Sequence, residues 1–108
     1  MPDTISREEL RSAIDDAAVT VVDALPSAPF AQRHLPGAVN VVAEDPDQRV
    51  QTLLPDRAAS IVSYSTDQAC TRGPELAERL KRLSYSDVRS YAGGIEDWVA
   101  AGYPVERQ

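Results

Sequence analysis

The strongest constraint on the fold of this chain is an alternation of short apolar runs with segments of helical periodicity. Four runs have the length and composition of buried strands, and they span residues 19–23, 38–42, 60–64 and 88–91. Helical signals fall at residues 7–16, 46–53 and 73–83 and in a last segment that carries Ile95, Trp98 and Val99. Strands that alternate with helices at short spacing usually pair in parallel. The pattern therefore predicts an α/β domain with three layers, in which helices cover both faces of a central, mainly parallel sheet.

Local signals place several helix boundaries. Ser6 and Glu9 have the spacing of a capping box, which predicts that the first helix begins directly after Ser6. Asp45 followed by Pro46 is typical of an N-cap residue and the first helical residue. Residues 24–36 contain three prolines, so we expect an irregular connection with a helical turn near residues 30–33.

Composition narrows the functional classes. A length of 108 residues, 43% hydrophobic and 26% charged, predicts one globular domain over residues 1–108. A net charge of −6 argues against nucleic acid or an anionic membrane as a partner. The polar N-terminus and the lack of a long apolar run lead us to expect a cytoplasmic protein. A single cysteine excludes an internal disulfide and a CxxC zinc site, so no metal is expected.

The loop after the third apolar run is the most promising place for chemistry. Ligands of parallel sheets bind beyond the carboxyl ends of the strands, and this loop also leads into a helix. A helix N-terminus adds partial positive charge and free N–H groups, so the loop is suited to anions. The candidate residues are Ser65, Thr66, Asp67, Gln68, Ala69, Cys70, Thr71 and Arg72.

Three segments resemble the rhodanese family in their order and spacing. Residues 30–40, FAQRHLPGAVN, resemble the family's signature of an aromatic residue followed by histidine, an aliphatic residue and Pro-Gly-Ala. Residues 93–98, GGIEDW, followed by GYP at 102–104, resemble the signature that closes the domain. Residues 61–83 between them resemble the family's active-site strand, loop and helix.

The resemblance implies a sulfurtransferase chemistry that needs neither metal nor organic cofactor. In active members a cysteine at the first loop position is a thiolate, attacks the outer sulfur of a donor such as thiosulfate and holds a persulfide. The persulfide then passes to a nucleophilic acceptor such as a thiol or cyanide. The expected partners are therefore a small sulfur-containing anion and such an acceptor, or a protein that donates or accepts sulfur.

The chain departs from the family at the catalytic position. Counting from the strand, Ser65 stands where active members have cysteine. A serine oxygen cannot carry a persulfide, and no histidine lies nearby in sequence to activate the hydroxyl. Ser65 is either a natural replacement or an introduced near-isosteric change, and the family reaction is not expected at this position.

Cys70 and Arg72 leave two further questions open. Some single-domain rhodaneses have a second, non-catalytic cysteine at the end of the loop, which is where Cys70 stands. Cys70 is then either a small, partly buried residue or an alternative thiol near a helix start. Arg72 either neutralises an anion in the loop or is a solvated helix-start residue, while Asp67 would oppose a phosphate.

The remaining motif residues are interpreted as structural. Asp23 ends the first strand, where the family also has an acid, but Leu25 stands where an arginine usually follows. His34 within its motif is expected to make a structural hydrogen bond rather than to act as a base. Packing and backbone turns are the expected roles of the other motif residues, Pro36, Gly37, Gly93, Gly94 and Trp98.

Three functional hypotheses follow from the sequence. The leading one is a rhodanese-family sulfurtransferase domain that is inactive as written because Ser65 replaces the nucleophile. The first alternative is a non-catalytic binding or regulatory module of the same fold, favoured by the missing arginine at Leu25. The second alternative is an enzyme that acts through Cys70.

Overall fold

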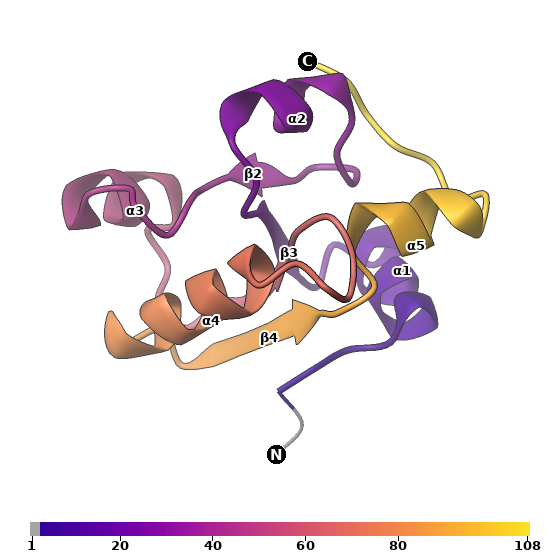
Figure 1. Ribbon diagram of the computed structural model, residues 1–108. Helices are drawn as coiled ribbons and strands as arrows, with labels where there is room; N and C mark the ends of the chain where they lie inside the picture. Colours follow the sequence, from indigo (N-terminus) through magenta and orange to yellow (C-terminus); the bar gives the residue numbers. More distant parts are fainter. Residues whose placement is uncertain (1–2) are drawn as a thin grey trace.

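A computed structural model describes residues 3–108 and has a four-stranded parallel sheet at its centre (Figure 1). The strand order is β2-β1-β3-β4, and every neighbouring pair is parallel. The strands are β1 (Thr20–Asp23), β2 (Val39–Asn40), β3 (Ser60–Tyr64) and β4 (Asp87–Tyr91). The predicted α/β class with a parallel sheet is therefore confirmed.

Residues 3–108 form five helices around the sheet. They are α1 (Arg7–Asp15), α2 (Ser27–Gln32), α3 (Asp47–Leu53), α4 (Arg72–Arg82) and α5 (Gly94–Ala100). Four of them, α1, α3, α4 and α5, contribute to the two core clusters. Buried residues of α3 and α4 pack in one core cluster, and those of α1 and α5 pack in another. Figure 1 shows α4 on one side of the strands and α1 with α5 on the other.

Successive residues of the strands supply the two clusters, because side chains of a strand alternate between the faces of a sheet. Val22 and Ile61 belong to the cluster of α3 and α4. Val21 and Val62, their neighbours in sequence, belong to the cluster of α1 and α5. Both faces of the central strands are therefore buried, which explains why these strands read as continuous apolar runs.

The first helix begins as its sequence predicts. The Ser6 hydroxyl accepts a hydrogen bond from the Glu9 N–H at 3.1 Å, and the Glu9 carboxylate accepts one from the Ser6 N–H at 3.3 Å. This reciprocal pair confirms the capping box. Leu10, which follows it, is fully buried against the sheet.

Two predictions around β2 were wrong. The strand was expected over residues 38–42 but pairs only at Val39 and Asn40, although the Val41 N–H still donates to the Asp23 carbonyl at 3.1 Å. Asp45 was expected to cap the third helix, but its carboxylate accepts a hydrogen bond from the Val42 N–H at 3.0 Å instead. Pro46 occupies the cap position without a side-chain hydrogen bond, and the helix begins one residue later than expected.

Other boundaries differ by small amounts. The helical turn expected at residues 30–33 is a six-residue helix, Ser27–Gln32, which buries Phe30. The helix expected over 73–83 spans Arg72–Arg82. Among residues 3–108, no helix has the length and apolar character required to cross a membrane.

The topology identifies one edge of the sheet as the place for a site. After β1 the chain adds β2 on one side and β3 on the other, so the direction of winding changes between β1 and β3. Crevices of this type lie outside the carboxyl ends of the strands. The loop that follows Tyr64 starts at this end of β3.

Candidate active-site loop

Ser65 lies at the centre of the candidate site, directly after β3, and is 3% exposed. The first turn of α4 packs closely against it: a methyl group added to Gly73 would lie 3.2 Å from the Ser65 hydroxyl oxygen and backbone nitrogen. The Gly73 carbonyl also accepts a hydrogen bond from Ser63 at 2.8 Å. The loop over residues 65–71 is therefore fixed between the end of β3 and the start of α4.

The start of α5 holds the other side of this loop. The Ile95 N–H donates to the Ser65 carbonyl and the Glu96 N–H donates to the Thr66 carbonyl, each at 2.9 Å. Gly94, with φ of +66°, makes this contact feasible: a methyl group there would lie 2.5 Å from the Ser65 carbonyl oxygen. Only glycine combines this left-handed backbone with so close an approach.

These two hydrogen bonds orient the backbone of the loop. In a trans peptide the carbonyl of one residue and the N–H of the next point in opposite directions. Because the carbonyls of Ser65 and Thr66 face α5, the N–H groups of Thr66 and Asp67 point away from α5, and that of Thr66 lies beside the Cys70 thiol. The helix α5 therefore turns backbone donors inward, although it lies about 30 residues away in sequence.

The Cys70 thiol faces this interior. Partial burial by itself would raise the pKa of the Cys70 thiol, but several hydrogen bonds outweigh it. They come from the Ser65 hydroxyl, from the backbone N–H groups of Thr66 and Arg72, and from the Thr66 hydroxyl. Together they lower the pKa of the Cys70 thiol below its ordinary value, which favours the nucleophilic thiolate.

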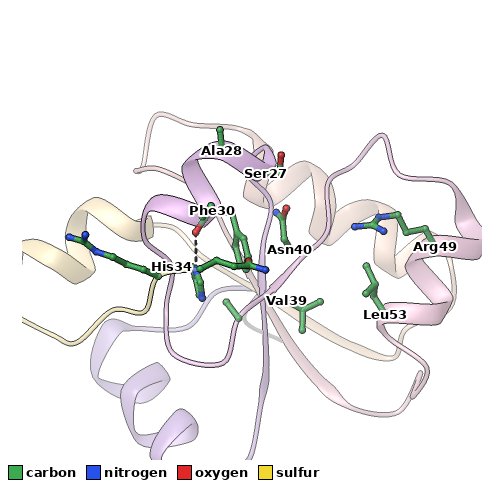
Figure 2. Close-up of a pocket in the computed structure, with 12 residues that line it drawn as sticks. Ser27, Ala28, Phe30, His34, Val39, Asn40, Arg49 and Leu53 are labelled. Atoms are coloured by element: carbon green, nitrogen blue, oxygen red, sulfur yellow. Dashed lines mark hydrogen bonds between the residues drawn. The ribbon is translucent and has the colours of Figure 1, made fainter.

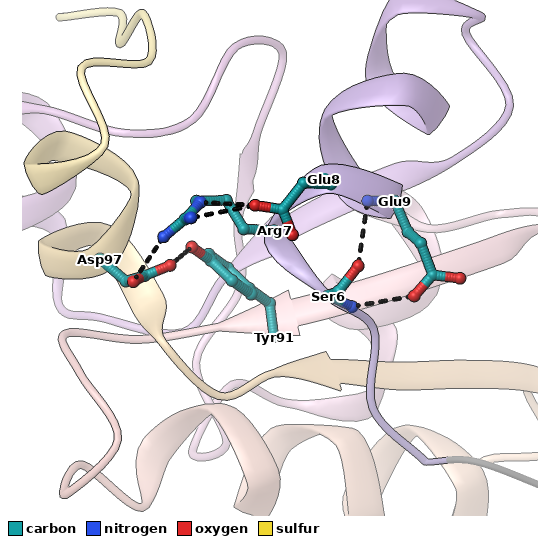
Figure 3. Close-up of polar contacts among 6 residues, drawn as sticks. All are labelled: Ser6, Arg7, Glu8, Glu9, Tyr91 and Asp97. Atoms are coloured by element: carbon teal, nitrogen blue, oxygen red, sulfur yellow. Dashed lines mark hydrogen bonds and ion pairs between the residues drawn. The ribbon is translucent and has the colours of Figure 1, made fainter.

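A polar cluster anchors α5 to α1 (Figure 3). Arg7 donates to one oxygen of Asp97 at 3.0 Å, and the Tyr91 hydroxyl donates to the other. Burial, and then the hydrogen bond to Asp97 and its charge, raise the pKa of the Tyr91 hydroxyl. The hydroxyl therefore stays a donor to Asp97. A further ion pair joins Arg33, after α2, to Glu96.

Asp23 forms a second buried network at the end of β1. Its carboxylate accepts hydrogen bonds from the Tyr64 hydroxyl at 2.6 Å and from the Leu25 N–H at 2.8 Å. The same hydroxyl accepts from the Leu35 N–H at 3.0 Å. Burial raises the pKa of the Asp23 carboxyl, although both hydrogen bonds and the charge of His34 act in the opposite direction. Asp23 thus joins the ends of two strands to the segment after α2.

His34 lies away from the loop of residues 65–72. Its Nδ1 is 2.8 Å from the Phe30 carbonyl oxygen, and its ring stacks on the Phe30 ring with centroids 4.0 Å apart. It lines a surface cavity of about 780 Å³ between α2, β2, α3 and the C-terminal segment (Figure 2). Its other ring nitrogen, Nε2, lies 3.9 Å from the Glu106 carboxylate, so both nitrogens of His34 face groups other than Ser65.

The other motif residues lie outside the loop and have structural roles. Gly37 has φ of +74°, and its N–H donates to the Glu106 carboxylate at 2.9 Å; Pro36, before it, is half-buried. Gly93 occupies the cap position of α5. Trp98 is 1% exposed in the core, and its Nε1–H donates to the Pro104 carbonyl at 2.7 Å.

The structure divides the predicted loop residues into two groups. Ser65, Thr66 and Cys70 meet in the interior, as described above. Asp67, Gln68, Ala69 and Thr71 are exposed on the rim. The Arg72 side chain pairs with Glu44 at 3.7 Å, and its backbone N–H rather than its guanidinium serves the thiol.

The comparison with protein families agrees with this architecture. The family described as "Rhodanese-like domain" matches residues 6–101, which is most of the chain. The chain belongs to the rhodanese-like domain family. Ser65 and Cys70 both lie in the loop between β3 and α4. Ser65 directly follows the strand, and Cys70 lies two residues before the helix begins.

Two proteins of known structure are similar to this rhodanese-like domain over nearly its whole length. A thiosulfate sulfurtransferase from Pseudomonas aeruginosa is 27% identical with a TM-score of 0.82, over 97% of this chain and 20% of the other. The BH2092 protein from Bacillus halodurans has a TM-score of 0.88 at 22% identity, over 96% and 76% of the two chains, which shows the shared fold.

A further relative is named as a transcriptional regulator. "HTH-type transcriptional regulator Rv0324" from Mycobacterium tuberculosis is 33% identical over 104 residues, which are 96% of this chain and 45% of that protein. The rhodanese-like domain thus spans less than half the length of this relative.

Sequence reasoning missed several residues that shape the loop. The sequence did not decide the role of Tyr64, whose hydroxyl accepts a hydrogen bond from the Leu35 N–H and donates one to Asp23. Arg7 and Asp97 were not singled out, although their ion pair fixes α5 against α1. No local pattern indicates this pair, because its members lie at opposite ends of the sequence.

Proposed function

We propose that this domain is a rhodanese-type sulfurtransferase that carries sulfur on Cys70, while Ser65 stands at the family's nucleophile position and assists the thiol. The supporting observation is that Cys70 faces the Ser65 hydroxyl and the inward N–H groups of Thr66 and Arg72. Cys70 is also the single cysteine in the sequence, so any persulfide on this chain must form there.

The proposed reaction has two steps that balance in atoms and charge. The Cys70 thiolate attacks the outer sulfur of a sulfane donor such as thiosulfate, the donor's S–S bond breaks, and sulfite leaves with the bonding electron pair. A thiol or cyanide-type acceptor, or a protein thiol, then attacks the outer sulfur of the persulfide and returns Cys70 as a thiolate. No metal, organic cofactor or external oxidant takes part.

Ser65 has a supporting role in this proposal. Its oxygen cannot hold a persulfide, but its hydroxyl lies beside the Cys70 thiol and lowers the pKa of that thiol. A hydrogen bond to a charged acceptor stabilises the thiolate more than the thiol, so Ser65 favours the reactive form. The inward N–H groups act in the same direction on the persulfide anion that forms.

The test is sulfur transfer to cyanide, measured as thiocyanate, with thiosulfate and with a small-molecule persulfide as alternative donors. We expect the unaltered chain to be active with at least one donor, Cys70→Ser to be inactive, and Ser65→Cys to be more active than either. Inactivity of the unaltered chain with both donors, or retained activity in Cys70→Ser, contradicts the proposal. Far-UV circular dichroism of each variant confirms that it is folded.

A second candidate is a non-catalytic regulatory module. It is favoured by the relative named as a transcriptional regulator and by Leu25 at a position where the family usually has arginine. Under this alternative, the folded chain takes no sulfur from either donor, and Ser65→Cys remains inactive as well. Activity that appears only in Ser65→Cys would instead support a sulfurtransferase scaffold that its serine has disabled.

A further inference from the structure

The surface cavity of about 780 Å³ between α2, β2, α3 and the C-terminal segment takes no part in the proposed sulfur transfer (Figure 2). Its volume is within the range of about 300–1,000 Å³ that is usual for small-molecule sites. Apolar side chains of three elements meet there, Phe30 of α2, Val39 of β2 and Leu53 of α3. Val39 and Leu53 pack against the core but are only partly buried, so they leave apolar surface on the cavity wall.

Backbone hydrogen bonds fix the wall that the C-terminal segment forms. The His34 N–H donates to the Glu106 carbonyl at 2.9 Å, and the Glu106 N–H donates to the His34 carbonyl at 2.8 Å. Further along, the Gln108 N–H donates to the Ala31 carbonyl at 3.1 Å. The His34 side chain, which also lines the cavity, is 7% exposed. The cavity is therefore bounded by fixed groups and does not need a ligand to form.

Asn40 presents a hydrogen-bond acceptor to the cavity. Its Nδ2 donates to the Asp23 carbonyl at 3.0 Å and to the Leu25 carbonyl at 2.7 Å, so both amide hydrogens are used and the amide has one orientation. Its Oδ1 accepts no hydrogen bond from residues 3–108, and no fully buried side-chain oxygen in that range lacks a partner. The Oδ1 is therefore open to solvent on the cavity wall, where a ligand N–H or O–H can bind it.

Arg49 supplies a positive charge to the same cavity. Figure 2 shows its side chain extending from α3 toward Asn40. The Arg49 Nε lies 3.5 Å from the Asp45 carboxylate, which is longer than an ordinary hydrogen bond. That carboxylate already accepts the Val42 N–H at 3.0 Å. Arg49 is thus loosely paired, and its planar guanidinium has the geometry to bind both oxygens of a carboxylate.

We propose that this cavity is a binding site for a small carboxylate with an apolar body and an N–H or O–H donor. The carboxylate pairs with Arg49, the donor binds the Asn40 Oδ1, and the apolar body covers Val39 and Leu53. An inorganic anion would leave the apolar surface wet, and a hydrocarbon would desolvate Arg49 and Asn40 without replacing their hydrogen bonds with water. Binding here is independent of sulfur transfer at Cys70.

Indole-3-acetate is a suitable probe, because it combines an apolar ring, an indole N–H and a carboxylate. Indole-3-acetamide lacks the charge, and 1-methylindole-3-acetate lacks the N–H donor. Titration of the ¹⁵N-labelled chain, followed by the chemical shifts of its backbone amides, locates each probe and gives its Kd. We expect saturable shifts at Val39, Asn40 and Leu53 with indole-3-acetate at millimolar concentrations. Each of the other two probes should bind at least about threefold more weakly.

Two variants separate the charge from the space. Arg49→Gln removes the charge, and Ala28→Trp fills the cavity from an exposed position on α2. Arg82→Gln is the matched control, because Arg82 is an exposed arginine at the end of α4 that does not line the cavity. We expect indole-3-acetate to bind Arg49→Gln about tenfold more weakly, and indole-3-acetamide to bind it within about twofold of the unaltered chain. Ala28→Trp should bind neither probe, and Arg82→Gln should bind both normally.

Two results would overturn the site. The first is a lack of saturable binding by the unaltered chain, or shifts spread over the surface and away from the cavity. The second is equal affinity of the unaltered chain and Arg49→Gln for indole-3-acetate. The amide spectrum of each variant shows whether it is folded, so weaker binding is not confused with unfolding. These readouts do not involve Cys70, so the site and the proposed sulfurtransferase function fail or survive separately.

Discussion

Replacing Gly94 by alanine tests whether α5 fixes the loop. Gly94 has φ of +66°, and an added methyl group would lie 2.5 Å from the Ser65 carbonyl oxygen and 2.6 Å from two backbone atoms of Thr66. Gly102 offers a matched control, because it has φ of +79° and nothing within 4 Å of the methyl position. Both substitutions carry the cost of a left-handed backbone, about 1–2 kcal/mol, but only Gly94→Ala forces the loop to move.

The difference between the two variants can be estimated from the contacts. Displacing backbone atoms in a packed site costs about 1–3 kcal/mol. Ile95 and Glu96 donate one hydrogen bond each to the loop carbonyls, both at 2.9 Å. Losing them lowers the free energy of unfolding by about 0.5–1.5 kcal/mol for each bond. We therefore expect Gly94→Ala to be less stable than Gly102→Ala by about 2–6 kcal/mol.

The assay is urea unfolding of both variants and of the unaltered chain, followed by circular dichroism. The pH dependence of Cys70 alkylation in Gly94→Ala provides a second measurement, since the loss of the inward N–H groups should raise the pKa of the thiol. Equal stability of the two variants, within about 0.5 kcal/mol, would refute the reasoning. An unchanged alkylation profile would show that α5 does not orient the donors around Cys70.

Three further predictions concern the buried groups. Tyr64→Phe leaves the Leu35 N–H and the Oδ2 oxygen of Asp23 without their partner, while Oδ1 keeps the Leu25 N–H. The free energy of unfolding should therefore fall by about 2–4 kcal/mol in urea titrations, and a loss below about 1 kcal/mol would contradict the network. Burial raises the pKa of the Asp23 carboxyl above 3.8. The contribution of this carboxyl to stability is therefore complete at low pH and declines as the pH rises through the raised pKa. Asp23→Asn should lack this decline in unfolding experiments across a pH series. Ser65→Ala removes a hydrogen bond to the thiolate, so alkylation of Cys70 near neutral pH should slow by about 3–10-fold, and an unchanged rate would exclude this role of Ser65.

Local sequence patterns were sufficient for most of the fold. The strand runs and the amphipathic helix α4 were predicted within two residues, because burial on both faces of a parallel sheet leaves an apolar run that the sequence displays. The capping box of α1 is likewise a local signal. The prediction failed at Asp45, where the carboxylate accepts a hydrogen bond from the Val42 N–H and does not cap the following helix.

The candidate site could be located from the sequence, but its interior could not. Ser65 and Cys70 were both placed in the loop after β3, yet the direction in which each side chain and N–H group points was beyond local reasoning. That direction depends on Gly94 and on donors of α5 from a distant part of the chain. The hydrogen bonds of Asp67 to its own loop were not predicted either, because they require the turn that the loop adopts.

The measurement that tests the central claim most directly is the intact mass of the chain after incubation with a small-molecule persulfide, with peptide mapping of the product. We predict a gain of one sulfur atom, located on Cys70, removed by cyanide and absent in Cys70→Ser. A chain that gains no sulfur, while Ser65→Cys gains one on the new cysteine, would contradict the claim. Sulfur chemistry would then belong to the position at the end of β3, and Cys70 would be a structural residue of the loop.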